Sequence, residues 1–419
     1  MGRTTTLLPL LIAVACGHIA PVAHAEEPGL VSERPISGRF VETDRGYMVP
    51  YTVTLPDVTP GQQQPITFQM MPIPGGTFLL GSPPDEPGRR EDEGPQVEVR
   101  VDPFWMAVHE VTWDEYAEFM RLDRVFLELE QREMAKVDPN LRIDAITAPS
   151  IVYDPNYHIE FTTSVRCPAV SMTQYAARQY TKWLSKVTAQ DFRLPTEAEW
   201  EYACRAGSTT SWSTAGDADE LRASAVFELS RDVEQGPREV GSLQANAWGL
   251  CDMHGNVSEW VLDQYDAKHY AAVADRSPIT TAGAVRAPDQ RYLHVHRGGN
   301  WTSQAVDCRS AARSHSSRDL WNDDPSIPMS PSWMASSEAN AIGFRLLRPL
   351  KAMSIEEGRR AWDADSAELL SDLDELRELG TCRIGLIDGT YINAARRVSA
   401  RNLQHRRSED ELRERIFHR

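Results

Sequence analysis

The segment from Asn246 to Trp260, NAWGLCDMHGNVSEW, constrains the fold of this chain more than any other stretch. Its two glycines interrupt both helical and strand periodicity, so the pattern predicts a glycine-shaped loop. Trp248 and Trp260 are suited to anchor that loop in a core. Its backbone carbonyls, with the carboxylates of Asp252 and Glu259, offer the several oxygens that a hard cation such as calcium requires. A tryptophan-anchored turn with solvated acids explains the spacing equally well.

Five more segments carry recognisable motifs, in this order: IPGGTFLLGS, HEVTWDEYAEF, RLPTEAEWEYACRAG, HRGGNW and IGFRLL. Together with the loop they resemble, in sequence and in order, the signature segments of the formylglycine-generating enzyme family, also called the sulfatase-modifying-factor family. The resemblance extends from about Phe68 to Leu350. It implies an α+β, loop-rich fold, a formylglycine-generating-enzyme-like variant of the C-type lectin fold.

Composition bounds the class of protein. The 419 residues are 41% hydrophobic and 25% charged, which is typical of a globular protein. The formal net charge of −17 leaves no broad excess of Lys and Arg to neutralise phosphates, so general nucleic-acid binding is excluded.

Residues 1–25 have the pattern of a secretory signal peptide. Arg3 supplies a positive start, Leu7 to Ala15 form an apolar stretch, and Ala23-His24-Ala25 matches a cleavage site. We therefore expect cleavage after Ala25 and a secreted or periplasmic location. No apolar stretch is long enough for a transmembrane segment.

Five cysteines remain after the signal peptide, and they are Cys167, Cys204, Cys251, Cys308 and Cys382. An exported protein can form disulfides, but an odd number leaves at least one thiol unpaired. Their pairing is open.

After the signal peptide, the sequence divides into three parts. We expect an N-terminal extension or linker with about one strand over 26–64, and the family domain over 65–350, in which 123–166 is an insertion. Within the domain, FQMMPI and TFLLGS are expected to form a hairpin, and Val97, Val99 and Val101 to share one strand face. The accessory region 351–419 is predicted to contain an amphipathic helix and a hairpin at Asp388-Gly389.

Helix starts are marked by capping patterns. Capping boxes are predicted for Thr112 with Glu115, Ser171 with Gln174, Thr196 with Glu199 and Ser354 with Glu357. The neighbouring acids Glu197 and Glu201 are explained as part of a solvated first turn.

Enzymes of the family bind copper(I) through two cysteines that follow the Gly-Gly-x-Trp motif. Those positions are Ser303 and Cys308 here. A serine hydroxyl is a poor ligand for this soft ion, so the two-thiolate site is incomplete and copper is not expected. Cys308 is either a lone thiol in the former active-site cleft or a small buried hydrophobe.

The structural calcium that the resemblance implies is better matched. Its ligands by position are the carboxylates of Asp252 and Glu259 and the carbonyls of Gly255 and Val257. His294 and His296 share one strand face and could also bind a metal, but no third ligand is identifiable, and such pairs are commonly at the surface.

Three functions remain open. The first is an exported binding or accessory module, or a divergent enzyme that uses the same cleft. The second is an oxidase that converts a sulfatase cysteine to formylglycine, and the third is a structural protein that acts through 351–419. An exported protein or peptide is the expected partner, and the oligomeric state is open.

Overall fold

The computed structural model describes residues 27–56, 65–132, 144–149, 164–214, 216–228, 236–318, 330–334, 336–380 and 382–404. Its longer helices are α1 (Trp113–Met120), α2 (Leu122–Gln131), α3 (Gln174–Thr188), α4 (Glu197–Arg205), α9 (Ile355–Trp362), α10 (Ala367–Glu378) and α11 (Gly389–Gln404). Short helices are α5 (Ala218–Leu221), α6 (His269–Ala274), α7 (Thr281–Ala284) and the 3-10 turns η1 (Glu91–Glu93), η5 (Ala305–Cys308) and η6 (Glu338–Ala341).

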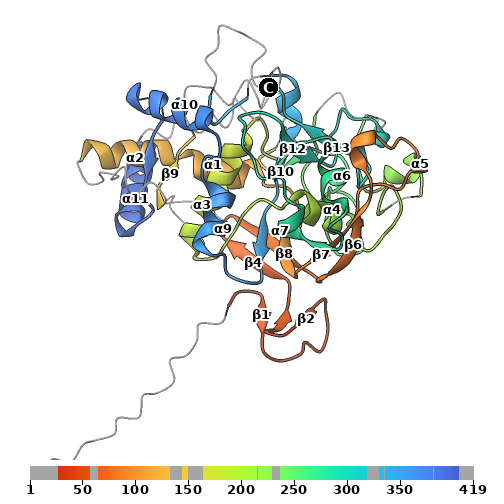
Figure 1. Ribbon diagram of the computed structural model, residues 1–419. Helices are drawn as coiled ribbons and strands as arrows, with labels where there is room; N and C mark the ends of the chain where they lie inside the picture. The colour runs from red at the N-terminus through yellow and green to blue at the C-terminus, as the bar shows by residue number, and fades with distance from the viewer. Residues whose placement is uncertain are drawn as a thin grey trace, which may run out of the picture.

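The strands within these ranges are short and form several small sheets. Two sheets have four strands each, in the orders β13-β12-β10-β14 and β15-β8-β5-β4, and a third has the order β11-β7-β6. The bounds are β4 (Tyr51–Thr54), β5 (Thr67–Ile73), β6 (Gly76–Leu80), β7 (Val97–Val101), β8 (Phe104–Ala107), β10 (Ser258–Gln264), β11 (Ile279–Thr280), β12 (His294–Arg297), β13 (Arg313–His315), β14 (Ile342–Gly343) and β15 (Leu347–Pro349). Figure 1 shows β10, β12 and β13 together in one half of the molecule, with α4 next to them.

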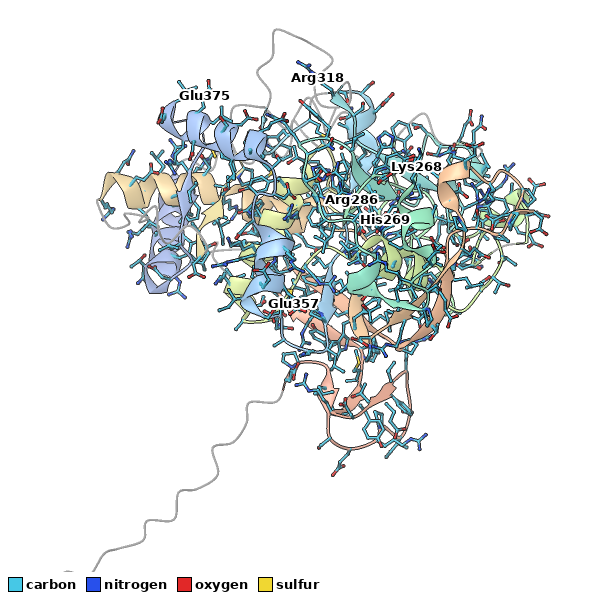
Figure 2. All side chains as sticks on the ribbon, viewed as in Figure 1. Lys268, His269, Arg286, Arg318, Glu357 and Glu375 are labelled. Carbon is cyan, nitrogen blue, oxygen red and sulfur yellow. The ribbon has the colours of Figure 1, made fainter. Side chains whose placement is uncertain are left out.

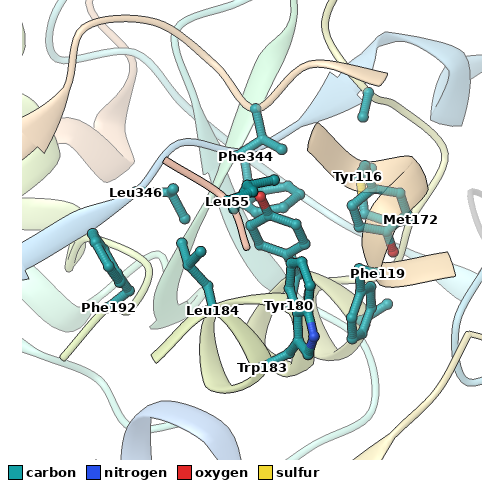
Figure 3. Close-up of a cluster of buried hydrophobic side chains, with 14 of the residues drawn as sticks. Leu55, Tyr116, Phe119, Met172, Tyr180, Trp183, Leu184, Phe192, Phe344 and Leu346 are labelled. Atoms are coloured by element: carbon teal, nitrogen blue, oxygen red, sulfur yellow. The ribbon is translucent and has the colours of Figure 1, made fainter. Parts of the chain in front are cut away.

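An aromatic cluster joins α1 and α3 to the sheets. Tyr116 of α1 stacks on Tyr180 of α3 with ring centroids 5.7 Å apart, and Phe344 meets both rings edge-on. Figure 3 shows these rings together with Phe119 and Trp183. Helix α1 begins as predicted, because the Thr112 side chain accepts a hydrogen bond from the Glu115 N–H.

The predicted alternation of β7 is confirmed. Val97, Val99 and Val101 are buried, whereas Glu98 and Arg100 between them are exposed. The capping boxes of α4 and α9 are confirmed as well. The cap predicted for α3 was wrong: Thr173 caps this helix, while the Ser171 hydroxyl donates to Asn340 Oδ1 at 2.9 Å.

The acids of α4 differ from the expected solvated turn. Glu197 is 3% exposed and pairs with Arg297 and Arg313, at 3.2 Å and 2.7 Å. Glu201 is fully buried and pairs with Arg297 and Arg205. The arginines come from β12, β13 and the end of α4, so these carboxylates hold the helix against the sheet.

Two expectations for the N-terminal part were wrong. FQMMPI and TFLLGS do not pair with each other, because β5 pairs with β4 and β8 while β6 pairs with β7. The turn between them instead contacts α4, since the Tyr202 hydroxyl donates to the Pro74 carbonyl at 3.0 Å. The extension also contains more than one strand: β1 (Leu30–Val31), β2 (Val41–Thr43) and β3 (Gly46–Met48) form a sheet of their own.

The insertion and the C-terminal region pack on each other. Strand β9 (Ile146–Thr147) of the insertion pairs antiparallel with β16 (Ile384–Gly385), and α11 packs against α2. The expected hairpin at Asp388-Gly389 was therefore wrong. One strand pairs with the insertion and Asp388 precedes α11, where it accepts a hydrogen bond from the Thr390 N–H at 2.8 Å. In Figure 1 these elements lie side by side, and Figure 2 shows Glu375 on the outer side of α10.

Arg178 of α3 ties the C-terminal region to the domain. Its guanidinium is buried and donates to the carbonyls of Arg360, Ala361 and Asp363 at 2.6 to 2.9 Å, and it pairs with Asp365. Removal of this side chain would leave several buried acceptors without a donor. Residues 355–365 are thus part of the folded domain.

The predicted signal peptide lies outside the described residues. Among those that are described, no helix combines the length and the apolar character needed to cross a bilayer.

Candidate functional site

The 246–260 segment folds as the predicted anchored loop. Trp260 donates its indole N–H to the Met172 carbonyl at 3.0 Å, and Trp248 packs against Tyr202 with centroids 4.8 Å apart. Between these anchors the backbone turns at Asp252 and Gly255, where φ is +59° and +88°. The turn therefore needs a left-handed backbone, which glycine adopts without strain.

Glu259 is held by an arginine. The guanidinium of Arg345 binds both carboxylate oxygens at 2.6 Å, and the indole N–H of Trp200 donates to Oε2 at 2.7 Å. Arg345 also donates to the carbonyl of Cys251, and so connects the closing IGFRLL motif to the loop. This fully buried ion pair occupies the carboxylate that was expected to bind calcium.

Asp252 faces a different acid, Glu110 of the HEVTWDEYAEF motif. Burial, and then the charge of Asp252, raise the pKa of Glu110 well above its usual range. Asp252 Oδ2 accepts the Gly241 N–H at 2.6 Å, and Glu110 Oε1 accepts the Asn256 amide at 3.0 Å. Within the described residues Glu110 Oε2 is buried and has no hydrogen-bond partner. Two buried carboxyls in contact require a shared proton or a cation.

The donor set fits the predicted calcium in part. Three carboxyls, of Glu110, Asp252 and Glu259, lie near the single guanidinium of Arg345, which leaves excess negative charge. Asp252 and the unpartnered oxygen of Glu110 suit a cation, whereas Glu259 is committed to its ion pair. Among the described residues no group of three or more His, Cys, Asp or Glu side chains is placed to hold a metal. Carbonyls such as those of Gly255 and Val257 would have to complete the shell, so this site stays a prediction.

Ser303 and Cys308 lie together, as the resemblance implies. The backbone N–H of Asn300 donates to Ser303 Oγ at 3.0 Å. The same N–H also contacts the Cys308 thiol and lowers its pKa, but burial raises this pKa by more. A hydroxyl thus lies at the position where the resemblance implies the first of the two cysteines.

Cys308 is fully buried, and burial raises the pKa of its thiol. All five cysteines after the signal peptide are free and buried, so no second thiol is bonded to Cys308. Cys204 is linked to the same region through His254, whose ring lies 3.7 Å from the Cys204 sulfur and contacts the Cys308 carbonyl at 2.8 Å. Burial raises the pKa of Cys204 to about 12. Burial therefore favours the neutral thiol over the nucleophilic thiolate at both sulfurs.

The expected surface position of the strand histidines was wrong. His294 and His296 of β12 are 4% and 8% exposed, and burial lowers their pKa to about 4 and about 3. Both rings are therefore neutral.

A pocket of about 550 Å³ opens beside these elements. It is lined by His296, Asn300, Trp301, Thr302, Ser314, His315, Ser337, Glu338, Ala341 and Ile342. The pocket adjoins the Gly298-Gly299-Asn300-Trp301 turn, next to Ser303. Sequence reasoning had not selected Glu110, His315 or Glu338, because their importance depends on contacts between distant segments.

Fold and site together define a loop-rich α+β domain with an anchored acidic loop and a pocket beside a Gly-Gly-Asn-Trp turn. The family model of the sulfatase-modifying factor enzyme 1-like domain matches residues 56–324, and the chain belongs to this family. The predicted family and fold are thus confirmed.

Curated relatives include enzymes and an inactive homologue. The serine/threonine-protein kinase pkn1 of Chlamydia caviae is 30% identical over 68% of this chain, and the alignment spans 39% of the kinase's own length. The formylglycine-generating enzyme of Mus musculus is 28% identical over 63% of this chain and 75% of the relative. The inactive C-alpha-formylglycine-generating enzyme 2 of Bos taurus is 29% identical over 58% of this chain and 86% of the relative. Among solved structures, PvdO from Pseudomonas aeruginosa is 28% identical over 67% of this chain and 94% of that chain, with a TM-score of 0.46.

Proposed function

We propose that this chain is an exported member of the family that does not carry out copper-dependent oxidation and that binds a ligand in the pocket beside the Asn300-Trp301 turn. The observation that carries the proposal is the pair Ser303 and Cys308 around the Asn300 N–H, one hydroxyl and one buried thiol. Copper(I) chemistry in this family needs two thiolates. A relative that is named inactive, 29% identical to this chain, is in keeping with a domain that has lost oxidation.

The pocket supports a binding role because polar side chains share its lining with apolar surface and because it lies beside the segment to which the resemblance assigns the family's chemistry. Asn300, Trp301 and Thr302 line it and immediately precede Ser303. The alternative in which 351–419 acts alone is less favoured, since Arg178 and the β9–β16 pair build that region into the domain. We also propose that a structural calcium sits at Glu110 and Asp252.

Copper binding tests the proposal directly. The full mature protein is titrated anaerobically with copper(I) against a chromogenic chelator. In a second assay, a cysteine-containing sulfatase peptide is incubated with the protein and oxygen, and mass spectrometry then measures the mass of the peptide. We expect no stoichiometric copper and no aldehyde. The Ser303→Cys variant should bind copper(I), because it adds a sulfur next to Cys308, and Ser303→Cys with Cys308→Ala should not. Stoichiometric copper and aldehyde formation by the wild-type protein would overturn the proposal.

A further inference from the structure

Ser213 is hydrogen-bonded to a buried histidine of the 246–260 loop. Its hydroxyl oxygen lies 2.9 Å from His254 Nε2, and its backbone N–H donates to the same nitrogen at 3.1 Å. The histidine is 1% exposed, whereas Ser213 is half-buried and keeps part of its surface at the solvent. A residue at the surface is thus paired with a base that is shielded from bulk water.

The direction of this hydrogen bond follows from the other ring nitrogen. His254 Nδ1 lies 2.8 Å from the Cys308 carbonyl oxygen, which can only accept, so Nδ1 carries the hydrogen. The pKa of His254 is lowered to about 4, chiefly by burial and further by the charge of Arg205, against the opposing effect of the carbonyl hydrogen bond. The ring is therefore neutral, Nε2 has a free lone pair for a donor, and the Ser213 hydroxyl donates to it.

The Cys204 thiol does not replace Ser213 at this lone pair. Its sulfur lies 3.8 Å from Nδ1 and 3.7 Å from Nε2 of His254, and a position nearly equidistant from the two nitrogens is not in line with either. The thiol also has the Met253 carbonyl as an acceptor at 3.6 Å. The hydroxyl is therefore the side-chain donor to Nε2.

The chain before Ser213 is fixed in place by the segment around η5. The Ser211 carbonyl accepts the Ser310 N–H at 2.8 Å, and the Trp212 indole donates to the Ala305 carbonyl at 3.1 Å. The hydroxyl, the imidazole and the carbonyl that orients the imidazole thus form one preorganised series. Such a series of nucleophile, base and orienting group is the arrangement that activates a serine.

We propose that Ser213 is a nucleophilic serine that takes an acyl group from a small, activated carboxylic ester, with His254 as its general base. Ser213 Oγ attacks the carbonyl carbon, its proton passes to Nε2, and an ester bond to the serine forms. The bond to the leaving alcohol or phenol breaks, and His254 gives the proton to the leaving oxygen. This site shares no residue with the pocket beside Asn300-Trp301, so the inference goes beyond the proposed function.

Acetylation of the full mature protein by p-nitrophenyl acetate tests the inference. Ser208 is the internal control, because it is half-buried on the same loop but its hydroxyl bonds to that of Thr210 and not to a base. Trypsin cuts after Arg205 and Arg222, so both serines lie on one peptide, and tandem mass spectrometry of acid-quenched samples measures the acetyl group on each. We expect Ser213 to be acetylated at least about tenfold faster than Ser208, since general-base assistance contributes roughly 100-fold or more and a base of lowered pKa contributes less.

Three variants locate the reactive group. Ser213→Ala should abolish the rapid initial release of p-nitrophenol, and Ser208→Ala should leave it unchanged. His254→Gln removes the base and should lower acetylation of Ser213 to the rate of Ser208. Circular dichroism checks that this variant is folded, and the comparison of the two serines in the unaltered protein stands without it.

The pH dependence separates assistance by His254 from simple exposure of a hydroxyl. Because the pKa of His254 is about 4, the base is neutral throughout the range from about pH 5 to 8, and the rate at Ser213 should be constant there. The rate at Ser208, which has no base, should rise with the hydroxide concentration.

Equal acetylation of the two serines, no acetylation of Ser213, or a Ser213 rate that rises across this pH range would overturn the inference. Unchanged acetylation in folded His254→Gln would do the same. These outcomes are separate from the copper result. A protein that lacks copper and has an unreactive Ser213 loses only the inference, whereas an active oxidase loses the proposed function whatever the ester gives.

Discussion

Ser303 and Cys308 both contact the backbone N–H of Asn300, which donates a hydrogen bond to the Ser303 hydroxyl at 3.0 Å. The two side chains at the positions that the resemblance assigns to the copper ligands are therefore adjacent, and one of them is a hydroxyl. For this reason a single substitution at 303 is an informative test.

The turn at Gly255 should tolerate no side chain. A Cβ at this glycine would lie 2.2 Å from the Val226 carbonyl oxygen, and its φ is +88°. Gly207 has a φ of +89° and nothing within 4 Å of a Cβ, so it is a matched control for backbone strain alone. We expect Gly207→Ala to cost about 1 kcal/mol and Gly255→Ala clearly more, measured by urea unfolding. Equal losses would show that the close approach is unimportant.

The buried pair of Glu259 and Arg345 should be essential for stability. Glu259→Gln leaves a fully buried guanidinium without its counter-charge, and we expect a loss of about 3–5 kcal/mol in the free energy of unfolding. Glu356→Gln breaks the exposed pair with Arg360 and should cost under about 1 kcal/mol. Comparable losses in the two variants would contradict this prediction.

The C-terminal region should contribute to the stability of the whole domain. Arg178→Met keeps much of the side-chain volume but removes the donors to Arg360, Ala361 and Asp363. We expect the variant to unfold in one cooperative transition, with its free energy of unfolding lowered by at least about 3 kcal/mol. Calorimetry that showed an early, separate transition of the C-terminal region would mean instead that it folds alone.

Calcium should raise the melting temperature. A ligand at one hundred times its Kd adds about 2.7 kcal/mol to the free energy of unfolding. Comparison of chelator-treated protein with and without calcium measures this, and Glu110→Gln with Asp252→Asn should abolish the increase. Magnesium serves as the control ion. An undiminished calcium effect in the double variant would place the ion elsewhere.

Acid should destabilise the protein partly through His294. Burial lowers its native pKa to about 4, from an unfolded value near 6.5. Between these values the unfolded chain binds a proton that the native chain does not, so stability is complete above pH 6.5 and falls toward pH 4. The full effect of this one group is on the order of 3 kcal/mol. His294→Gln should flatten the pH dependence in that window, and an unchanged slope would exclude this contribution.

Local patterns predicted local structure well. The alternation at Val97, Val99 and Val101 and the caps at Thr112, Thr196 and Ser354 depend on neighbours a few residues away, so the sequence displays them. The ordered motifs identified the family domain.

Long-range partners were not predictable in the same way. Strands β9 and β16 have two residues each, too few for a periodic signal, and their pairing depends on the whole fold. Glu110 lies beside Asp252, and Arg345 binds Glu259. Both contacts join segments that are far apart in the sequence. The acids of α4 were predicted to be solvated because no residue close to them in the sequence indicates that Arg297 and Arg313 pair with them.

The β9–β16 pair has a consequence for biosynthesis. A ribosome makes Ile146–Thr147 long before Ile384–Gly385. The insertion must therefore wait, without its edge partner, while more than half of the polypeptide is still being translated. During that interval the unpaired backbone of the insertion is open to pairing with other chains.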